Sequence, residues 1–310
     1  MYTEYYGLKE RPFSLSPDPS FLYLSKQHRM ALTMLTYGLQ SYAGVTVISG
    51  EVGSGKTTLI REILNHMEKD INVGLISNAH NSFGNLLQWV LMAFNIKTDL
   101  KDKPNLYQIF VEFLIKEYAN NKRTVLIIDE AQNIDIETLE ELRLLSNINA
   151  DKHMVLQLVL IGQPELLETL QRHELRQLAQ RVSVDYKLKA LGYKETKAYI
   201  HHRLSVVGGK KEIFNKYAIA AIFYHTGGIP RLINTLCDFA LVYGFAEDAQ
   251  VIPLELMLSV IKDKQQGGVF PVMKDENNEQ ATVRMLVNQE KGIDIVPSEM
   301  KVKEEIITDL

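Results

Sequence analysis

Cysteine is almost absent from this chain, and long apolar runs are absent altogether. Cys237 is the only cysteine among 310 residues, which excludes a disulfide within the chain and argues against a thiolate zinc site. No stretch approaches the roughly 18 consecutive apolar residues that a membrane-spanning helix needs. The start of the chain also lacks a basic region followed by an apolar one. We therefore expect a globular, cytoplasmic protein that is not itself inserted in a membrane.

Neither sign of charge dominates the body of the chain. Lys and Arg number 34 and Asp and Glu number 38, which gives a formal net charge of -4. Residues 266–310 hold nine acidic and five basic residues, so this segment accounts for the whole acidic excess. The remainder is close to neutral and has no global basic field of the kind that nucleic-acid-binding domains show. Nucleic acid stays open as a partner but is not favoured.

Short apolar runs alternate with longer stretches of helical period in the first half of the chain. This alternation predicts an α/β fold, in which a parallel sheet is flanked by helices. The runs expected to be strands are short and rich in β-branched or other apolar residues, at 45–49, 73–77, 124–128, 155–161 and 182–187. The helices expected around them are 25–40, 83–94, 105–118 and 136–147.

The strand pattern stops near residue 190, and only helical periodicity follows, at 194–206, 215–224, 230–245 and 254–262. We therefore expect an α/β domain over 1–189, which includes an aromatic and proline-rich N-terminal segment, and a small helical domain over 190–265. Residues 266–310 lose sustained periodicity, which predicts a flexible acidic tail. Two short apolar clusters in that tail, at 283–287 and 293–296, leave open that it docks onto a partner.

A glycine-rich loop stands between the first expected strand and an amphipathic helix. It matches the pattern G-x-x-x-x-G-K-[ST], which in this context predicts a phosphate-binding P-loop. Its glycines let backbone N–H groups curl around phosphate oxygens, while Lys56 supplies a cation and the Thr57 hydroxyl is a ligand for Mg²⁺. The predicted nucleotide-binding residues are Gly50, Glu51, Val52, Gly53, Ser54, Gly55, Lys56, Thr57 and the neighbouring Thr58.

Two adjacent carboxylates, Asp129 and Glu130, follow the buried apolar run 125–128. Ligands of open parallel sheets bind at the carboxyl ends of the strands, and this arrangement resembles a Walker B motif. Asp129 would hold Mg²⁺ through water, and Glu130 would position and polarise the attacking water. An acidic N-cap is the alternative, but the P-loop favours an ATPase. No N-K-x-D pattern for guanine occurs, so ATP is favoured over GTP.

Further motifs resemble the AAA+ ATPases, which combine such a sheet with a helical lid and usually work as rings. The resemblance implies that residues 190–265 form the lid and that Gln163, after the fourth strand, is the sensor 1 residue. It also implies that Arg231, in Gly227-Gly228-Ile229-Pro230-Arg231, is the sensor 2 arginine over the phosphates of the same subunit. Arg181 is the preferred arginine finger for a neighbouring subunit, and Arg176 is the alternative.

The chain more narrowly resembles the ExeA/GspA-like secretion ATPases and their relatives in pilus-assembly and exopolysaccharide loci, over roughly residues 1–265. The resemblance implies ATP-driven ring assembly or switching that serves an envelope machine, with recruitment to the inner membrane by a partner left open. Longer members continue into a transmembrane span and a peptidoglycan-binding domain, which this sequence does not show. The motifs that carry it are Tyr5-Tyr6-Gly7-Leu8, Pro12-Phe13, Ser16-Pro17-Asp18-Pro19, Phe21-Leu22-Tyr23-Leu24-Ser25, Asp129-Glu130-Ala131-Gln132 and Gly162-Gln163-Pro164-Glu165-Leu166.

Three alternatives stay open at this point. One is a nucleotide-gated scaffold that hydrolyses slowly and mainly docks partners through its tail. Similar AAA+ modules serve transposition and helicase loading, so an ATP-dependent, DNA-associated regulator is the second hypothesis for the whole protein. Within the site, Tyr23 and His28 precede the P-loop and are candidates for framing adenine, although a structural role is equally compatible with their positions.

Overall fold

The computed structural model describes residues 1–16, 18–67, 70–77, 86–99, 102–150, 153–267 and 277–296. The chain divides into two compact units. We call Lys26–Lys189 the sheet unit, and Met1–Ser25 together with Ala190–Leu310 the helical unit. The division after residue 189 agrees with the expected domain boundary. The N-terminal segment, however, groups with the helices, whereas we expected it to belong to the α/β domain.

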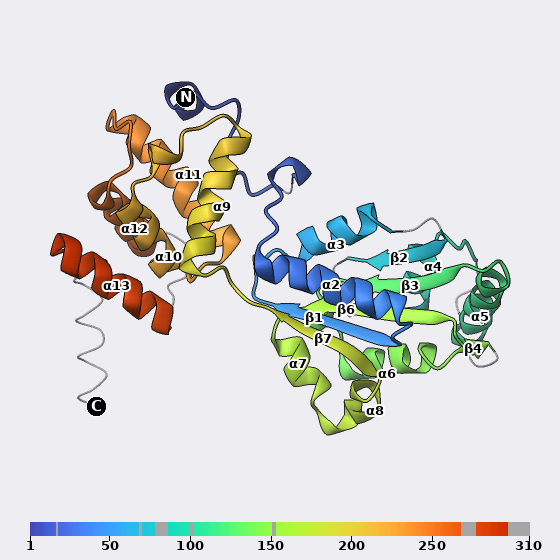
Figure 1. Cartoon of the computed structure of the whole chain (residues 1–310). Coiled ribbons are helices and arrows are strands. Elements are labelled where there is room, and N and C mark those ends of the chain that lie inside the picture. Colours follow the sequence, from blue (N-terminus) through green and yellow to red (C-terminus); the bar gives the residue numbers. More distant parts are fainter. Residues whose placement is uncertain are drawn as a thin grey trace. The chain divides into compact units, whose positions relative to one another are not determined.

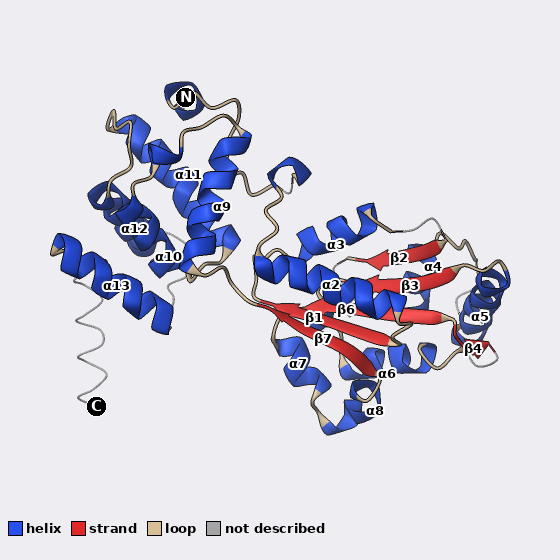
Figure 2. Ribbon diagram, viewed as in Figure 1, coloured by secondary structure: helices blue, strands red, loops and turns tan. Residues whose placement is uncertain are grey.

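The sheet unit is built on five parallel strands in the order β2-β3-β6-β1-β7 (Figure 2). The P-loop strand β1 is therefore flanked by β6 and β7, and the strand that ends in the two carboxylates, β3, pairs with β6. The strand positions predicted from the sequence agree with those of the structure to within two residues. The strands are β1 (Val45–Gly50), β2 (Ile71–Ile76), β3 (Arg123–Ile128), β6 (Leu156–Gly162) and β7 (Val182–Leu188), and a small antiparallel pair is formed by β4 (Asn149–Ala150) and β5 (His153–Met154).

Helices cover both faces of this sheet (Figure 1). Because successive strand residues point to opposite faces, Leu126 and Ile128 pack in the core with α4 to α8, whereas Val125 and Ile127 pack with α2 and α3. Residues 83–85 of the predicted helix 83–94 lie outside the described residues. The helices are α2 (Lys26–Gln40), α3 (Lys56–Asn65), α4 (Leu86–Ala93), α5 (Lys103–Ala119), α6 (Ile136–Leu145), α7 (Glu165–Leu170) and α8 (Arg176–Ala179).

The helical unit has a single core, to which the N-terminal segment contributes Tyr2, Tyr6, Phe13 and Phe21. None of the helices that the structure describes, in either unit, is both long and apolar enough to cross a membrane. The helices of this unit are α1 (Tyr2–Tyr5), α9 (Tyr193–Val206), α10 (Lys216–Thr226), α11 (Pro230–Ala246), α12 (Leu254–Gly267) and α13 (Asn278–Lys291).

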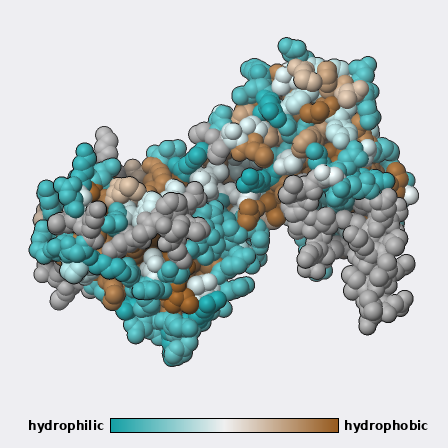
Figure 3. All heavy atoms as spheres, turned by 180° about the vertical axis from the view of Figure 1, so that it is seen from behind, coloured by the Kyte–Doolittle hydropathy of each residue, from teal (hydrophilic) through white to brown (hydrophobic). Residues whose placement is uncertain are grey.

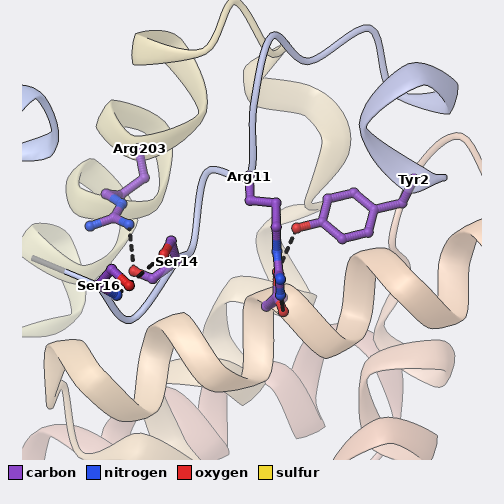
Figure 4. Close-up of polar contacts among 6 residues, drawn as sticks. Tyr2, Arg11, Ser14, Ser16 and Arg203 are labelled. Atoms are coloured by element: carbon purple, nitrogen blue, oxygen red, sulfur yellow. Dashed lines mark hydrogen bonds and ion pairs between the residues drawn. The ribbon is translucent and has the colours of Figure 1, made fainter. Parts of the chain in front are cut away.

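Polar contacts hold the N-terminal segment on this core (Figure 4). The guanidinium of Arg203, on α9, donates to the backbone carbonyl of Ser14 at 3.0 Å. The Tyr2 hydroxyl and the Arg11 guanidinium both donate to the carboxylate of Asp238 on α11. Burial of its ring, together with the hydrogen bond to Asp238, raises the pKa of Tyr2. These partners are far apart in sequence, which is why the motifs alone did not assign the segment to this unit.

Part of the expected flexible tail is ordered, because residues 278–291 form α13. Asn277 and Gln280 make a capping box at its start, an arrangement that satisfies two free backbone N–H groups of a helix terminus. Val283, Val287 and Ile295 are buried in the core of the helical unit. Part of each apolar cluster therefore packs within the chain, whereas Met285 and Leu286 of the first cluster are exposed. Residues 268–276 and 297–310 lie outside the described part.

The surface is mostly hydrophilic on the face that Figure 3 shows, where hydrophobic residues form small scattered groups. Such groups are ordinary on a globular protein, since much of any folded surface is apolar.

Candidate nucleotide site

The P-loop connects the end of β1 to the start of α3. Gly53 and Gly55 have φ angles of 77° and 102°, a region that L side chains rarely adopt. A Cβ atom on Gly55 would lie 2.6 Å from Nε2 of His28, on α2. That imidazole nitrogen is itself 3.1 Å from the carbonyl oxygen of Ser54. His28 thus supports the P-loop backbone, and both glycines are required by its conformation.

Lys56 is buried inside the curve of this loop. Its Nζ donates to the carbonyl oxygens of Gly50 at 2.7 Å and Glu51 at 3.1 Å. Burial lowers the pKa of Lys56, while the nearby carboxylates of Glu130 and Asp129 oppose that shift. A desolvated cation held at a ring of backbone groups is suited to phosphate oxygens, which would replace the lost hydration.

Thr57 and Asp129 meet as the two motifs predict. The Thr57 hydroxyl donates to Oδ2 of Asp129 at 3.3 Å. Burial raises the pKa of Asp129 and the neighbouring charge of Glu130 adds to this, although the Glu130 N–H donates to the carboxylate and opposes the rise. Hard oxygen ligands of this kind suit Mg²⁺. The buried hydroxyl of Ser54 has no hydrogen-bond partner among the described residues, so the loop keeps an unused polar group and fits a phosphate ligand.

Glu130 is the second residue after the end of β3 and has a φ of 55°. Its Oε2 accepts a hydrogen bond from Nε2 of Gln132 at 2.7 Å and a longer one from Nε2 of Gln163 at 3.4 Å. The Gln163 side chain, which follows the last residue of β6, is thus beside Glu130, and its role as a sensor stays a prediction. The sequence analysis gives Gln132 no role. Its amide stands two residues after Glu130 in the sequence, but its contact with Gln163 arises only because β3 pairs with β6.

The two candidate arginine fingers differ in their surroundings. Arg181 is half-buried, and its guanidinium donates to the carbonyl oxygen of Ser146 at 3.1 Å and to the Ser146 hydroxyl at 3.3 Å. Arg176, at the start of α8, is exposed. Within the described residues no hydrogen bond or ion pair engages its guanidinium. A residue that reaches a neighbouring subunit must be free to do so, and this difference favours Arg176 over our first choice, Arg181.

Arg231 lies in the first turn of α11, in the helical unit, and is exposed. The glycines before it have a structural role, because Gly227 ends α10 with a φ of 56° and a Cβ on Gly228 would lie 1.8 Å from the carbonyl oxygen of Leu191. Its position over the phosphates stays a prediction. Tyr23 also belongs to the helical unit, where its ring packs against Tyr199.

The parallel sheet and the glycine-rich loop between β1 and α3 are those of a P-loop fold. Residues 39–170 match a family model described as an AAA domain, so the sheet unit carries an AAA domain. Over 254 residues the chain is 41% identical to General secretion pathway protein A of Aeromonas hydrophila, which confirms the resemblance to that group of secretion ATPases. The match covers 81% of this chain but 46% of the relative, so the chain spans about half the length of that protein.

Solved structures of the same fold extend this result. The ORC2 protein of Aeropyrum pernix, in its ADPNP and ADP complexes, superposes with a TM-score of 0.59 at 16% identity and covers 97% of this chain and 89% of its own. Cdc6p of Pyrobaculum aerophilum gives a TM-score of 0.62 at 15% identity, covering 81% of this chain and 70% of its own. At such identities the likeness shows the fold alone.

Proposed function

We propose that this chain binds ATP with Mg²⁺ on its P-loop and hydrolyses the ATP. The observation that carries the proposal is the meeting of two motifs at the carboxyl edge of the sheet. Thr57 and Asp129 lie within hydrogen-bond distance there, and the charge of Glu130 acts on Lys56. Two independent sequence patterns thus converge on the place where ligands of open parallel sheets bind.

Each residue has a separate task in this proposal. The backbone of the P-loop and Lys56 bind the phosphates, and Glu130 orients and polarises the attacking water. Thr57 would hold Mg²⁺ directly and Asp129 through water. When bound, the ion would supply a Lewis acid that offsets charge on the phosphates. Gln163 and Arg231 would sense the terminal phosphate, and an arginine from a neighbouring subunit would complete the site in a ring.

The hydrolysis cycle would drive or switch the assembly of a bacterial envelope machine for secretion, pilus formation or exopolysaccharide export. The support for this process is the 41% identity to a relative whose name places that relative in secretion. In this role the chain is cytoplasmic and recruited to the inner membrane by a protein partner.

Phosphate release with Mg²⁺ and ATP tests the activity, measured against protein concentration for the wild type, Lys56→Ala and Glu130→Gln. We expect Glu130→Gln to bind ATP but to lower kcat by at least about 100-fold, because it removes the general base. Lys56→Ala should lose both binding and turnover. A wild type whose phosphate release does not exceed that of Glu130→Gln would refute hydrolysis. Complementation of a deletion strain by these variants, scored for secretion, pili and exopolysaccharide, tests the process.

A further inference from the structure

Gln132 makes two directional hydrogen bonds from the short helix that follows β3, η3 (Ala131–Asn133). Its Nε2 donates to Oε2 of Glu130 at 2.7 Å, and its Oε1 accepts from the backbone N–H of Gln163 at 2.9 Å. An amide nitrogen donates and an amide oxygen accepts. Both contacts therefore agree on one orientation of the Gln132 side chain, which spans the ends of two neighbouring strands.

The backbone of Glu130 adopts a conformation that few non-glycine residues adopt. A non-glycine residue with a φ of 55° is held in a sparsely populated conformation that costs roughly 1–3 kcal/mol. Such a conformation persists only when the surroundings hold it. Both amide donors, from Gln132 and Gln163, reach the same carboxylate oxygen, Oε2. Within the described part of the chain the other oxygen, Oε1, accepts no hydrogen bond, so this is the oxygen that would orient the attacking water.

The end of β6 makes room for this bridge. A Cβ atom on Gly162 would lie 2.9 Å from Oε1 of Gln132 and 2.9 Å from the side chain of Leu166. Any larger residue at that position would push the amide oxygen away from the Gln163 N–H that follows it in the chain. Gly162 and Gln132 are therefore matched to each other across the β3–β6 pair.

We propose that Gln132 is a positioning residue for ATP hydrolysis, which aims the Glu130 carboxylate and couples its direction to the backbone of Gln163. A displacement at the end of β6 would then be transmitted to the general base by one side chain. This inference rests on the proposed hydrolysis and adds to it a residue that acts through the Glu130 carboxylate. The competing explanation is a purely structural tie between the ends of β3 and β6.

Three variants separate these explanations. Gln132→Met keeps the length of the side chain but loses both hydrogen bonds. Gln132→Glu keeps an acceptor for the Gln163 N–H but places a carboxylate against Glu130, and like charges repel. Asn133→Ala is the matched control, because Asn133 is exposed in the same turn.

The experiment measures kcat, the dissociation constant for ATP and hydrogen exchange at the Gln163 amide. We expect Gln132→Met and Gln132→Glu to lower kcat by about 10- to 100-fold, the range for a misplaced catalytic group. Their ATP affinity should stay within about twofold of the wild type, since only the transition state loses an interaction. The Gln163 amide should lose protection in Gln132→Met and keep it in Gln132→Glu, and Asn133→Ala should match the wild type throughout.

Each contrary outcome is decisive. Wild-type kcat in Gln132→Met, or in Gln132→Glu with its Gln163 amide still protected, would overturn the positioning role and leave hydrolysis intact. An equal loss of ATP affinity and kcat would mean that the P-loop itself had been disturbed, and would overturn it too. Absence of turnover in the wild type would instead refute the proposed function.

Discussion

The sheet unit and the helical unit both bury ionisable groups, but they satisfy them differently. In the sheet unit, Lys56 and Asp129 are buried near each other and near Glu130, so charges act on charges at the edge of the sheet. In the helical unit, Arg203 and His225 are buried against backbone carbonyls of distant segments. Burial of an ionisable group alone therefore does not mark a site. The presence of several ionisable groups with perturbed pKa values, at a loop that fits a ligand, does.

The two units should therefore respond differently to mutation. Changes at the edge of the sheet should alter turnover with little effect on the free energy of unfolding. Changes at the buried groups of the helical unit should lower that free energy with little effect on nucleotide binding.

The largest expected effect distinguishes Arg176 from Arg181, both of the sheet unit. Arg176→Ala should lower kcat by about 1,000-fold, the lower range for loss of an arginine finger, because its exposed guanidinium can reach another subunit. Arg181→Ala should keep concentration-dependent turnover and lower the free energy of unfolding by about 1 kcal/mol, since it breaks the bonds to Ser146. Phosphate release and urea unfolding of both variants measure these effects. The reverse pattern would restore Arg181 as the trans arginine.

The next effect concerns Arg203 in the helical unit. Its Nε donates to the carbonyl oxygen of Pro12 at 2.5 Å and its guanidinium lies 4.4 Å above the Phe21 ring. Arg203→Met would leave buried carbonyls without a donor, which costs about 1–3 kcal/mol. We expect urea unfolding to show this loss while ATP affinity is unchanged. Lys197→Met, at an exposed position on the same helix, is the control, and a similar loss there would show that the contacts of Arg203 are unimportant.

The same contacts explain how far the sequence could predict the structure. Strands and the P-loop are local patterns, and Asp129 and Glu130 end an apolar run, so their meeting with Thr57 follows from the topology of a parallel sheet. The N-terminal segment was misplaced because Arg203 and Pro12 are 191 positions apart. Helix α13 was missed because its apolar residues are few and become informative only against the core that buries them.

The sequence predicts the candidate site about as far as it predicts the fold. The residue types that bind phosphate and Mg²⁺ are fixed by chemistry and spacing, which a sequence displays. Gln132 forms its bridge, and Arg181 its contact with Ser146, through side-chain geometry. No spacing in the sequence distinguishes either residue from an ordinary surface residue.

A smaller effect is expected from pH at His225. Burial lowers the pKa of this imidazole to about 4, while its Nε2 donates to the carbonyl oxygen of Ile295 at 2.8 Å and its Nδ1 accepts from Gln265. The pKa of His225 is lower in the folded chain than in the unfolded chain. The neutral imidazole therefore stabilises the folded state fully above about pH 6.5, and this stabilisation is lost as the pH falls towards 4. Between pH 7 and pH 5 the loss should be about 2 kcal/mol.

Urea unfolding of the helical unit at pH 7 and pH 5, followed for the wild type and His225→Gln, measures this loss. The glutamine can still donate an N–H but does not titrate. In His225→Gln the free energy of unfolding should therefore differ less between pH 7 and pH 5, by the same amount. An unchanged difference would show that His225 is not responsible.

The smallest effect compares helix caps in the two units. Asn277 caps α13 and Asp102 caps α5, each accepting a hydrogen bond from a backbone N–H of the first turn. Replacing either by alanine should cost about 1 kcal/mol. If α13 opens by itself, Asn277→Ala should speed hydrogen exchange along the whole helix by about fivefold, because exchange there follows the local opening equilibrium. Asp102→Ala should change exchange only in the first turn of α5, whose Leu106, Phe110 and Leu114 are fully buried. Equal, local changes in both would mean that α13 is as firmly part of its unit as α5, and that the two units differ in their buried charges but not in the cohesion of their helices.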